Sequence, residues 1–323
     1  MDTMTFIDVH GHLSPPGERG GGPPALRDPA AAIERKRALG IRYTVIGSPV
    51  GAGSMLPTGA ADNYRQSADQ VKAHNELMAR LVDSYPEALR TYAYVDPFGG
   101  DAMLAQARDL VADWRFAGLV VNTSIDGEYL GSPRAADFFA LADELRVPVL
   151  LHPPAAPVGS GSFTDLAMVE HLARFNDVTA GVASIVCAGW LERYPDLVLV
   201  AAAGGGGLAL LGEKLDVMAA SPRPPHAEIK RPALRRPPSE SLARIYVDTS
   251  NPTPAALAAN VTAFGAGHVL FGTDAPPLMD VLDRTVRMVA GAGLPPADRE
   301  LIAGGNAAAL YGLPVAPAHQ LTS

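Results

Sequence analysis

The stretch FIDVHGH at residues 6–12 is the part of the sequence that decides the fold. It is a short, largely apolar run that ends in two histidines, and a helical pattern at residues 30–39 follows it. Short apolar runs bounded by turn residues are typical of parallel strands that are covered on both faces. The stretch therefore predicts a strand followed by a helix, and the question is whether this unit repeats.

The unit repeats along the whole chain. Eight apolar runs predict strands at residues 6–10, 43–47, 91–95, 118–122, 147–152, 197–201, 245–248 and 268–272. Helical patterns occupy residues 30–39, 61–84, 101–114, 135–145 and 280–292. No G-x-G-x-x-G loop follows the first strand, which disfavours a doubly wound sheet. The alternation predicts an α/β fold, a (β/α)8 TIM-like barrel with a C-terminal helical tail.

Composition sets the class of protein. The chain has 323 residues, of which 48% are hydrophobic and 19% charged, and this composition excludes intrinsic disorder. We expect one domain over residues 1–323, with a Pro/Arg-rich loop insertion at 222–238. The net charge of −8 argues against nucleic acid as a partner. No apolar run reaches the roughly 20 residues of a membrane helix. The single Cys187 excludes a disulfide framework, and we expect a cytoplasmic protein.

Polar residues stand where the predicted strands end, and the active site of such a barrel lies at the carboxyl ends of its strands. His10 and His12 are two residues apart on the first strand, so their side chains point the same way. His152 ends the fifth strand and Asp274 follows the eighth. Three imidazoles and one carboxylate suit a divalent metal, so we predict a metal site. The other five histidines are not expected to be ligands: His74, His171, His226, His268 and His319.

The motifs DVHGH at 8–12, LHP at 151–153 and FGTDAP at 271–276 resemble the amidohydrolase superfamily. More narrowly, they resemble the amidohydrolase-2 branch, typified by 2-amino-3-carboxymuconate-6-semialdehyde decarboxylase. The resemblance implies that His10, His12, His152 and Asp274 bind one divalent metal, zinc first and manganese as the alternative. It also implies that Asp274 moves a proton, and that the protein is a homodimer. Residues 118–124 contain no lysine to carboxylate, so a mononuclear site is expected.

The sequence departs from this branch in two places. The family has His-x-Gly-Gly after the sixth strand, but Ala203 stands at the histidine position. Two interpretations are open: a variant inactivated by a His→Ala substitution, or a natural protein that lacks this group. Relatives often bind a substrate carboxylate with an arginine beyond the glycine-rich turn, where this chain has Lys214. Arg19 is a further candidate anion ligand, and Phe163 is a ring that could stack on a substrate.

Three functions follow from the resemblance and its departures. The first is nonoxidative decarboxylation of a small aromatic or enoic carboxylic acid. The second is hydrolysis of an amide, lactone or ester, which the change from arginine to Lys214 favours. The third is a catalytically silent binding protein, which Ala203 favours. Release of CO2 against incorporation of water into the product separates the first two.

Overall fold

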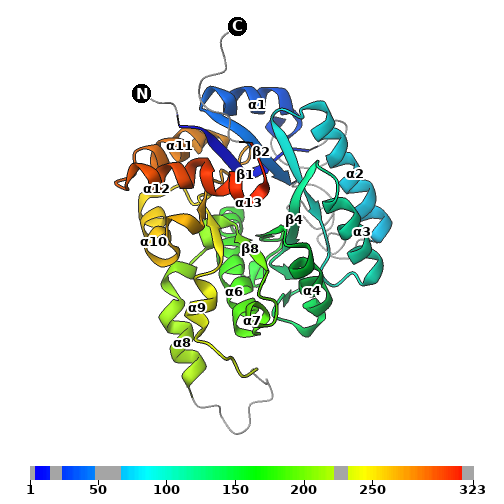
Figure 1. Ribbon diagram of the computed structural model, residues 1–323, viewed down its shortest axis with the longest axis vertical. Helices are drawn as coiled ribbons and strands as arrows, with labels where there is room; N and C mark the ends of the chain where they lie inside the picture. Colours follow the sequence, from blue (N-terminus) through cyan, green and yellow to red (C-terminus); the bar gives the residue numbers. More distant parts are fainter. Residues whose placement is uncertain (1–3, 15–23, 48–66, 222–231, 315–323) are drawn as a thin grey trace.

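The computed structural model describes residues 4–14, 24–47, 67–221 and 232–314. Eight parallel strands form one sheet in the order β1-β2-β3-β4-β7-β8-β9-β10, with helices around it (Figure 1). The predicted α/β barrel is confirmed. Its strands are β1 (Phe6–His12), β2 (Ile41–Gly47), β3 (Leu89–Tyr94), β4 (Phe116–Asn122), β7 (Pro148–His152), β8 (Val198–Ala201), β9 (Tyr246–Asp248) and β10 (Val269–Leu270). A small antiparallel pair, β5 (Ser124–Ile125) and β6 (Glu128–Tyr129), follows β4.

The barrel closes between its first and last strands. The backbone N–H of Val9 donates to Phe271 O at 2.9 Å, and the N–H of Asp274 donates to His10 O at 2.7 Å. Further along, the N–H of His12 donates to Ala275 O at 3.0 Å. This ladder continues beyond the two residues of β10, so the motifs at residues 8–12 and 271–276 lie side by side.

Helices form the outer layer of the barrel. The longer ones are α1 (Pro29–Ala38), α2 (Ala68–Ser84), α3 (Asp101–Val111), α4 (Ala136–Leu145), α6 (Arg174–Cys187), α8 (Gly212–Ala220), α10 (Pro254–Phe264) and α11 (Leu282–Ala290). The shorter ones are α5 (Leu166–Met168), α7 (Trp190–Arg193), α9 (Pro238–Leu242), α12 (Pro296–Glu300) and α13 (Asn306–Tyr311). Two π-helical segments, η5 (Val169–Ala173) and η10 (Leu301–Gly305), precede α6 and α13. The predicted C-terminal helical tail consists of α12, η10 and α13.

Apolar side chains fill the amino-terminal half of the barrel interior. Ile7, Val45 and Val200 belong to one buried cluster with Tyr92, and Tyr311 of α13 packs against it. The Tyr92 hydroxyl donates to Val9 O at 2.8 Å and lies 2.7 Å from the Tyr311 hydroxyl, so both buried phenols have partners. This end of the barrel is therefore a packed core, and polar groups are left to the opposite end, the mouth.

A bulge in β1 aims the histidines into the mouth. The register between β1 and β2 shifts between Asp8 and Gly11. Val9 belongs to the interior cluster, while Asp8 contacts Lys36 of α1 on the outside. Regular alternation would place His10 on the same face as Asp8. Because a β-bulge inserts an extra residue and changes which face a side chain occupies, His10 instead joins His12 inside the barrel.

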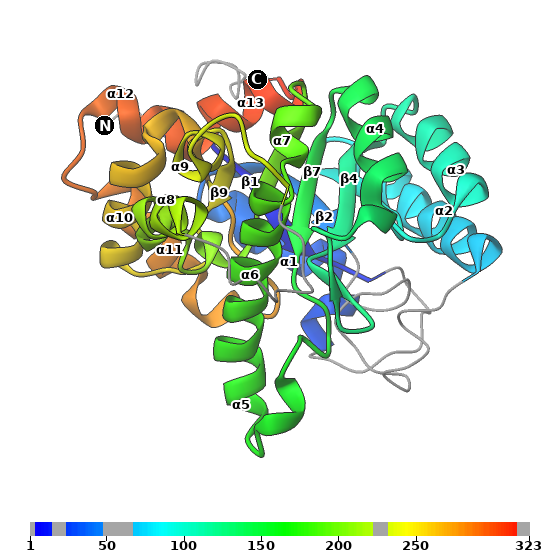
Figure 2. The same ribbon diagram turned by 90° about the horizontal axis from the view of Figure 1, so that it is seen from below.

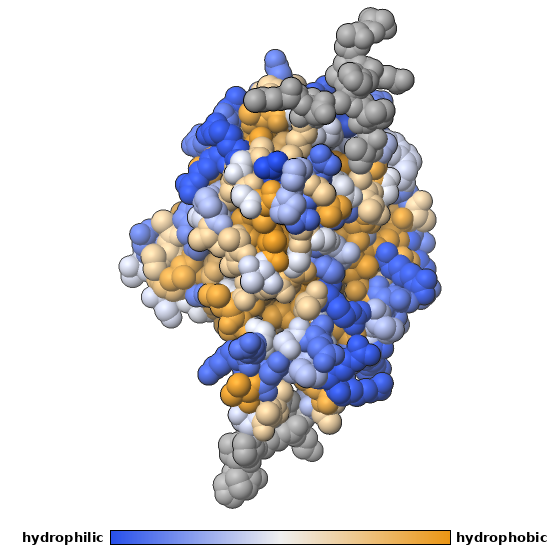
Figure 3. Space-filling model, turned by 60° about the vertical axis from the view of Figure 1, so that its left-hand side comes forward, coloured by the Kyte–Doolittle hydropathy of each residue, from blue (hydrophilic) through white to orange (hydrophobic). Residues whose placement is uncertain are grey.

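No helix in the described ranges is long and apolar enough to span a membrane. Figure 3 shows charged residues intermixed with apolar ones over one face of the molecule. Of the predicted insertion at 222–238, residues 222–231 lie outside the described part. The backbone N–H groups of Arg235 and Arg236 donate to Glu192 of α7 at 2.9 and 3.0 Å. The single-domain assignment and the insertion stay predictions.

Candidate metal centre

Three histidines converge at the mouth of the barrel. His10 and His12 come from β1, and His152 is the last residue of β7. One ring nitrogen from each lies within 4.8 Å of the others. The ring centroids are 5.0 to 5.1 Å apart, and each pair meets nearly edge to face, with interplanar angles of 77 to 87°. The structure thus brings together three of the four side chains that the sequence selected as ligands.

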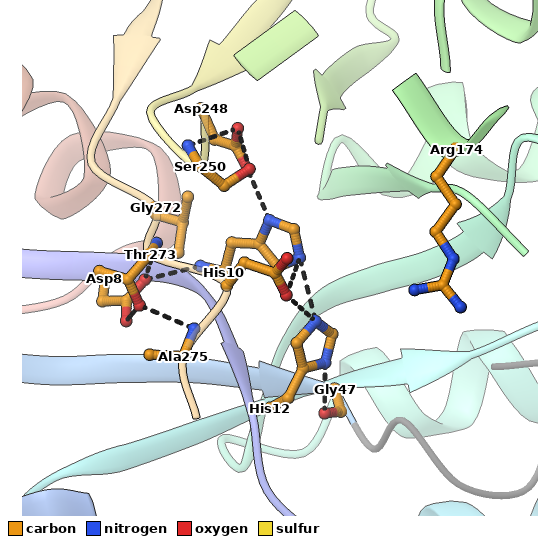
Figure 4. Close-up of polar contacts among 12 residues, drawn as sticks. Asp8, His10, His12, Gly47, Arg174, Asp248, Ser250, Gly272, Thr273 and Ala275 are labelled. Atoms are coloured by element: carbon orange, nitrogen blue, oxygen red, sulfur yellow. Dashed lines mark hydrogen bonds and ion pairs between the residues drawn. The ribbon is translucent and has the colours of Figure 1, made fainter. Parts of the chain in front are cut away.

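Hydrogen bonds fix the tautomers of two of these rings. His10 Nδ1 lies 2.5 Å from Asp248 Oδ2, and His12 Nδ1 lies 3.2 Å from the carbonyl oxygen of Gly47 (Figure 4). Both partners are acceptors, so each Nδ1 carries the proton. In the neutral form of each ring, which is the form that binds a metal, Nε2 then presents a lone pair, and the two Nε2 atoms lie 3.1 Å apart.

Asp274 adds a carboxylate to these lone pairs. Its Oδ1 lies 2.9 Å from His12 Nε2 and 3.8 Å from His10 Nε2. Oδ1 is buried without a hydrogen-bond donor among the described residues. Without a proton on either Nε2, these two lone pairs and the Asp274 carboxylate would repel one another. A divalent cation between them would reverse the sign of the interaction, and imidazole with carboxylate is a donor set that suits zinc and related metals.

Burial and charge set the protonation of the cluster. Burial lowers the pKa of His12 and, still further, that of His152. Burial acts on His10 in the same direction, but the charge and hydrogen bond of Asp248 outweigh it and raise its pKa to about 9. Burial alone would raise the pKa of Asp274, but the three neighbouring imidazoles hold it below its usual range. His12 and His152 are therefore neutral and ready to bind a metal at neutral pH.

Asp248 supports His10 from the end of β9. The side chain is fully buried, and its Oδ1 accepts hydrogen bonds from Gly204 N at 2.7 Å and from the Ser250 hydroxyl at 2.8 Å. Its Oδ2 accepts from His10. A carboxylate behind a ligating histidine fixes the orientation of the ring and raises its basicity.

Asp8 supports the same strand from behind. Its Oδ1 accepts from His10 N and Thr273 N, both at 3.0 Å, and its Oδ2 accepts from Thr273 Oγ1 at 2.6 Å. The ammonium of Lys36, on α1, lies 2.6 Å from Asp8 Oδ2, and both side chains are buried. This buried ion pair ties α1 and β1 to the segment that carries Asp274.

A cavity of about 580 Å³ opens beside the cluster. His10, His152 and Asp274 line it together with Ala203 and a wall from α6 and η5. This wall contributes Glu170, His171, Arg174 and Phe175. In Figure 2, α5 and the first turns of α6 project beyond the mouth of the barrel. Figure 4 shows the guanidinium of Arg174 turned toward the histidine cluster.

Two residues that line the cavity have unusual backbone angles. Ala203 has a φ of 52° and Asp274 a φ of 53°, in the left-handed region that side chains rarely occupy. Such conformations gather at functional sites. Ala203 adds only a methyl group where the resemblance leads one to expect a histidine.

Two further predicted site residues, Lys214 and Phe163, are not brought to the cluster. Lys214 is exposed on α8, and Phe163 is half-buried in the loop after β7. Neither lines the cavity beside the histidines within the described part of the chain. Arg19 lies outside the described residues. The strand-end residues Asp96 and Asn122 do not line the cavity either.

Sequence reasoning missed the α6 wall and the buried lysine. Arg174 and His171 lie in the helical stretch formed by η5 and α6, away from any strand end. A search for polar residues at strand ends could therefore not select them. Lys36 is one of three consecutive basic residues in the last turn of α1, and no sequence signal distinguishes it from its exposed neighbours. Asp248 is the last residue of β9, but its hydrogen bond to His10 could not be predicted from the sequence.

Known proteins were compared with this chain. Its fold is similar to 5-carboxyvanillate decarboxylase from Sphingomonas paucimobilis, with a TM-score of 0.80 and 18% identity over 96% of this chain and 99% of that one. It is also similar to 2,6-dihydroxybenzoate decarboxylase from Rhizobium, with a TM-score of 0.75 and 18% identity over 97% and 99% of the two chains. A third is a dihydroxybenzoic acid decarboxylase from Polaromonas, solved with manganese and 2-nitroresorcinol, with a TM-score of 0.77 and 18% identity over 99% and 100%.

At these identities the likeness shows the fold. No curated protein matches the chain. A family model of the amidohydrolase-2 type, described as Amidohydrolase, does match, over residues 7–313. The matched range includes His10, His12, His152 and Asp274, the four side chains of the candidate metal centre. The chain therefore belongs to the amidohydrolase-2 family.

Proposed function

We propose that this protein is a divalent-metal-dependent decarboxylase of a small aromatic carboxylic acid. The metal assignment rests on one observation. The Nε2 atoms of His10 and His12 lie 3.1 Å apart, next to the Asp274 carboxylate. We assign the ion to His10, His12, His152 and Asp274, with zinc or manganese as the metal. A divalent ion bound there supplies positive charge that polarises a substrate oxygen and stabilises developing negative charge.

Arg174 supports an acid as the substrate. Its side chain is only 15% exposed, and it lines the same cavity as His10, His152 and Asp274. A guanidinium binds a planar carboxylate through two parallel hydrogen bonds, which an ammonium cannot do. Arg174 thus takes the role that the sequence had suggested for Lys214 or Arg19.

The cavity supports a small ring. Its volume of about 580 Å³ lies within the usual range for small-molecule sites. Phe175 lines the same wall as Arg174 and offers an aromatic face, the role suggested earlier for Phe163. Three similar structures, named above, are decarboxylases of hydroxylated or methoxylated benzoic acids, which agrees with a substrate of this size.

Hydrolysis of an amide, lactone or ester is the second candidate. Asp274 favours it, because a carboxylate in the cavity can accept a proton from an attacking water. A neutral amide or ester, however, gives the Arg174 guanidinium no charge to bind.

The two reactions are separated by their products. We would incubate metal-loaded protein with hydroxybenzoic acids, enoic acids, lactones and amides in water labelled with oxygen-18. Decarboxylation releases CO2 and leaves no label in the organic product, whereas hydrolysis places labelled oxygen there. His12→Ala should abolish either reaction together with metal binding. His268→Gln is the matched control, because this histidine contacts Tyr246 at the opposite end of β10. If no compound gives a product, the hypothesis that remains is a catalytically silent binding protein.

A further inference from the structure

The ionisable side chains around the cavity form two sets. His10, His152 and Asp274 belong to the candidate metal centre. The second set comprises Glu170, His171 and Arg174, and it comes from one continuous helical stretch. The proposed decarboxylation requires a proton at the carbon that loses CO2, and the second set contains an imidazole that can donate one.

The second set is built on a π-helical turn. Residues Val169–Ala173 form η5, and α6 continues from Arg174 without a break. π-helical turns are rare, and they occur frequently at functional sites. Glu170, His171, Arg174 and Phe175 all face the cavity from this stretch. The turn therefore places a carboxylate, an imidazole and a guanidinium opposite the metal centre.

The chemistry of these three groups differs. An arginine keeps its proton throughout the physiological pH range, so Arg174 is a carboxylate anchor and not a proton donor. Carboxylic acids of glutamate type have usually lost their proton well below neutral pH. Imidazole is the side chain that gives and takes a proton near neutral pH. Of the described cavity residues outside the metal centre, His171 is thus the group suited to proton transfer.

The glycine-rich turn after β8 offers no replacement. Ala203 contributes a methyl group to the cavity, and its neighbours Gly204 and Gly205 have no side chains. Ser250 and Asn251 also line the cavity, but neither a hydroxyl nor an amide is an acid at neutral pH.

We propose that His171 is the general acid that protonates the substrate carbon, with Arg174 holding the carboxylate of the same substrate. This inference rests on the proposed function. The imidazolium N–H proton forms a new C–H bond at the ring carbon that carries the carboxylate. The bond between that carbon and the carboxylate then breaks, its electron pair restores the ring, and CO2 leaves. The neutral imidazole regains its proton from water.

The test compares His171→Gln with wild-type protein on an acid that wild type decarboxylates. We expect kcat to fall by roughly 10²–10⁴-fold, the range for loss of a general acid. KM and metal content should stay unchanged, because Arg174 and the four ligands are intact. In wild type, kcat should fall as pH rises and the imidazolium is lost, and in His171→Gln this alkaline fall should disappear. The groups whose charges bear on this profile are Glu170 and Arg174 on the same wall and His10, His152 and Asp274 across the cavity.

Two further variants keep the test decisive. His268→Gln is the matched histidine control and should retain the wild-type kcat and pH profile. Ala203→His, added to His171→Gln, places an imidazole at another position in the same cavity and should restore part of the lost kcat. If His171→Gln keeps kcat within twofold and retains the alkaline fall, the role of His171 is wrong while the decarboxylase stands. If wild type releases no CO2 from any acid, both the decarboxylase and this role are overturned.

Discussion

Asp248→Asn tests the reasoning behind the metal centre most directly. In the structure, Asp248 Oδ2 accepts the His10 Nδ1 proton at 2.5 Å, while Oδ1 accepts from Gly204 N and the Ser250 hydroxyl. An asparagine can keep its carbonyl oxygen on only one of these two sides. Because three donors hold the Oδ1 side, including the backbone N–H of Ser250 at 3.1 Å, the new amide N–H2 group should face His10.

The consequence for His10 is a change of tautomer. A donor at the Oδ2 position requires a lone pair on Nδ1, so the ring proton moves to Nε2. Nε2 is the atom that faces His12 and would bind the ion. Loss of such a supporting carboxylate typically weakens metal binding or activity by roughly 10–100-fold. That range corresponds to about 1.4–2.8 kcal/mol of binding free energy. The folded state should persist, because the substitution preserves side-chain volume.

The assay is competition for zinc or manganese between the protein and a chelator of known affinity. Asp248→Asn should show the weakened affinity at neutral pH, and Ser250→Ala, which keeps the carboxylate, should lose much less. Circular dichroism confirms that both variants are folded. Equal affinity of Asp248→Asn and wild type would refute the tautomer argument, and with it the assignment of His10 Nε2 to the ion.

Three further predictions follow from the same contacts. Lys36→Met leaves the buried Asp8 charge without its partner and should lower the free energy of unfolding, measured in urea, by about 3–5 kcal/mol. The control is Arg108→Met, which removes an exposed pair with Glu144 and should change the free energy of unfolding little. Gly272→Ala would place a Cβ 2.9 Å from Asp248 Cβ and 3.0 Å from His10 Cβ, so it should lower both Tm and metal affinity, while Gly293→Ala, with nothing within 4 Å, should lower neither. The stability of chelator-treated protein should peak near pH 6.5, the ordinary histidine pKa. It falls below that pH because burial lowers the pKa of His12 and His152, so the unfolded chain binds more protons. It falls above that pH because His10, with a pKa of about 9, holds its proton only in the folded state, and unfolding followed across pH checks both arms.

The barrel was predictable from the sequence because its signal is repeated. All eight predicted strands are present, each shifted at its ends by no more than a few residues. A continuous apolar run predicts a strand even when its ends are placed a few residues off. Both faces of such a strand are buried, so the prediction does not depend on which residue faces which side. The helices after β7, β8 and β9 were not predicted. α10 is apolar around most of its surface, and the segment before α6 passes through a π-helical turn, so neither shows a simple helical period.

The candidate site was predictable only where chemistry coincides with strand ends. His10, His12, His152 and Asp274 met that condition, and the structure gathers them. The direction of the β1 histidines depended on a bulge between Asp8 and Gly11, which no alternation rule reveals. The substrate wall was missed for a different reason. It comes from a helix that projects past the mouth (Figure 2), and a charged residue on a helix looks like ordinary solvated surface in sequence.

The glycine-rich turn after β8 explains how the metal centre can tolerate Ala203. The turn is held by backbone contacts: Gly204 N donates to Asp248, and Gly204 O accepts from the Asn260 amide at 2.8 Å. A Cβ on Gly204 would lie 2.6 Å from Asn251 Cβ, and Gly204 has a φ of 64°, so glycine is required there. These contacts support Asp248, and through it His10, without any side chain at position 203.

Support of the ion and transfer of the proton are therefore separate tasks in this barrel. The first depends on Asp248 and Asp8, which lie behind the histidines and are untouched by a change at position 203. The second depends on which imidazole reaches the substrate from the wall of the cavity. A chain with alanine at position 203 can thus retain an intact metal centre and still need its proton from another element, and η5 is the described segment that presents a histidine there.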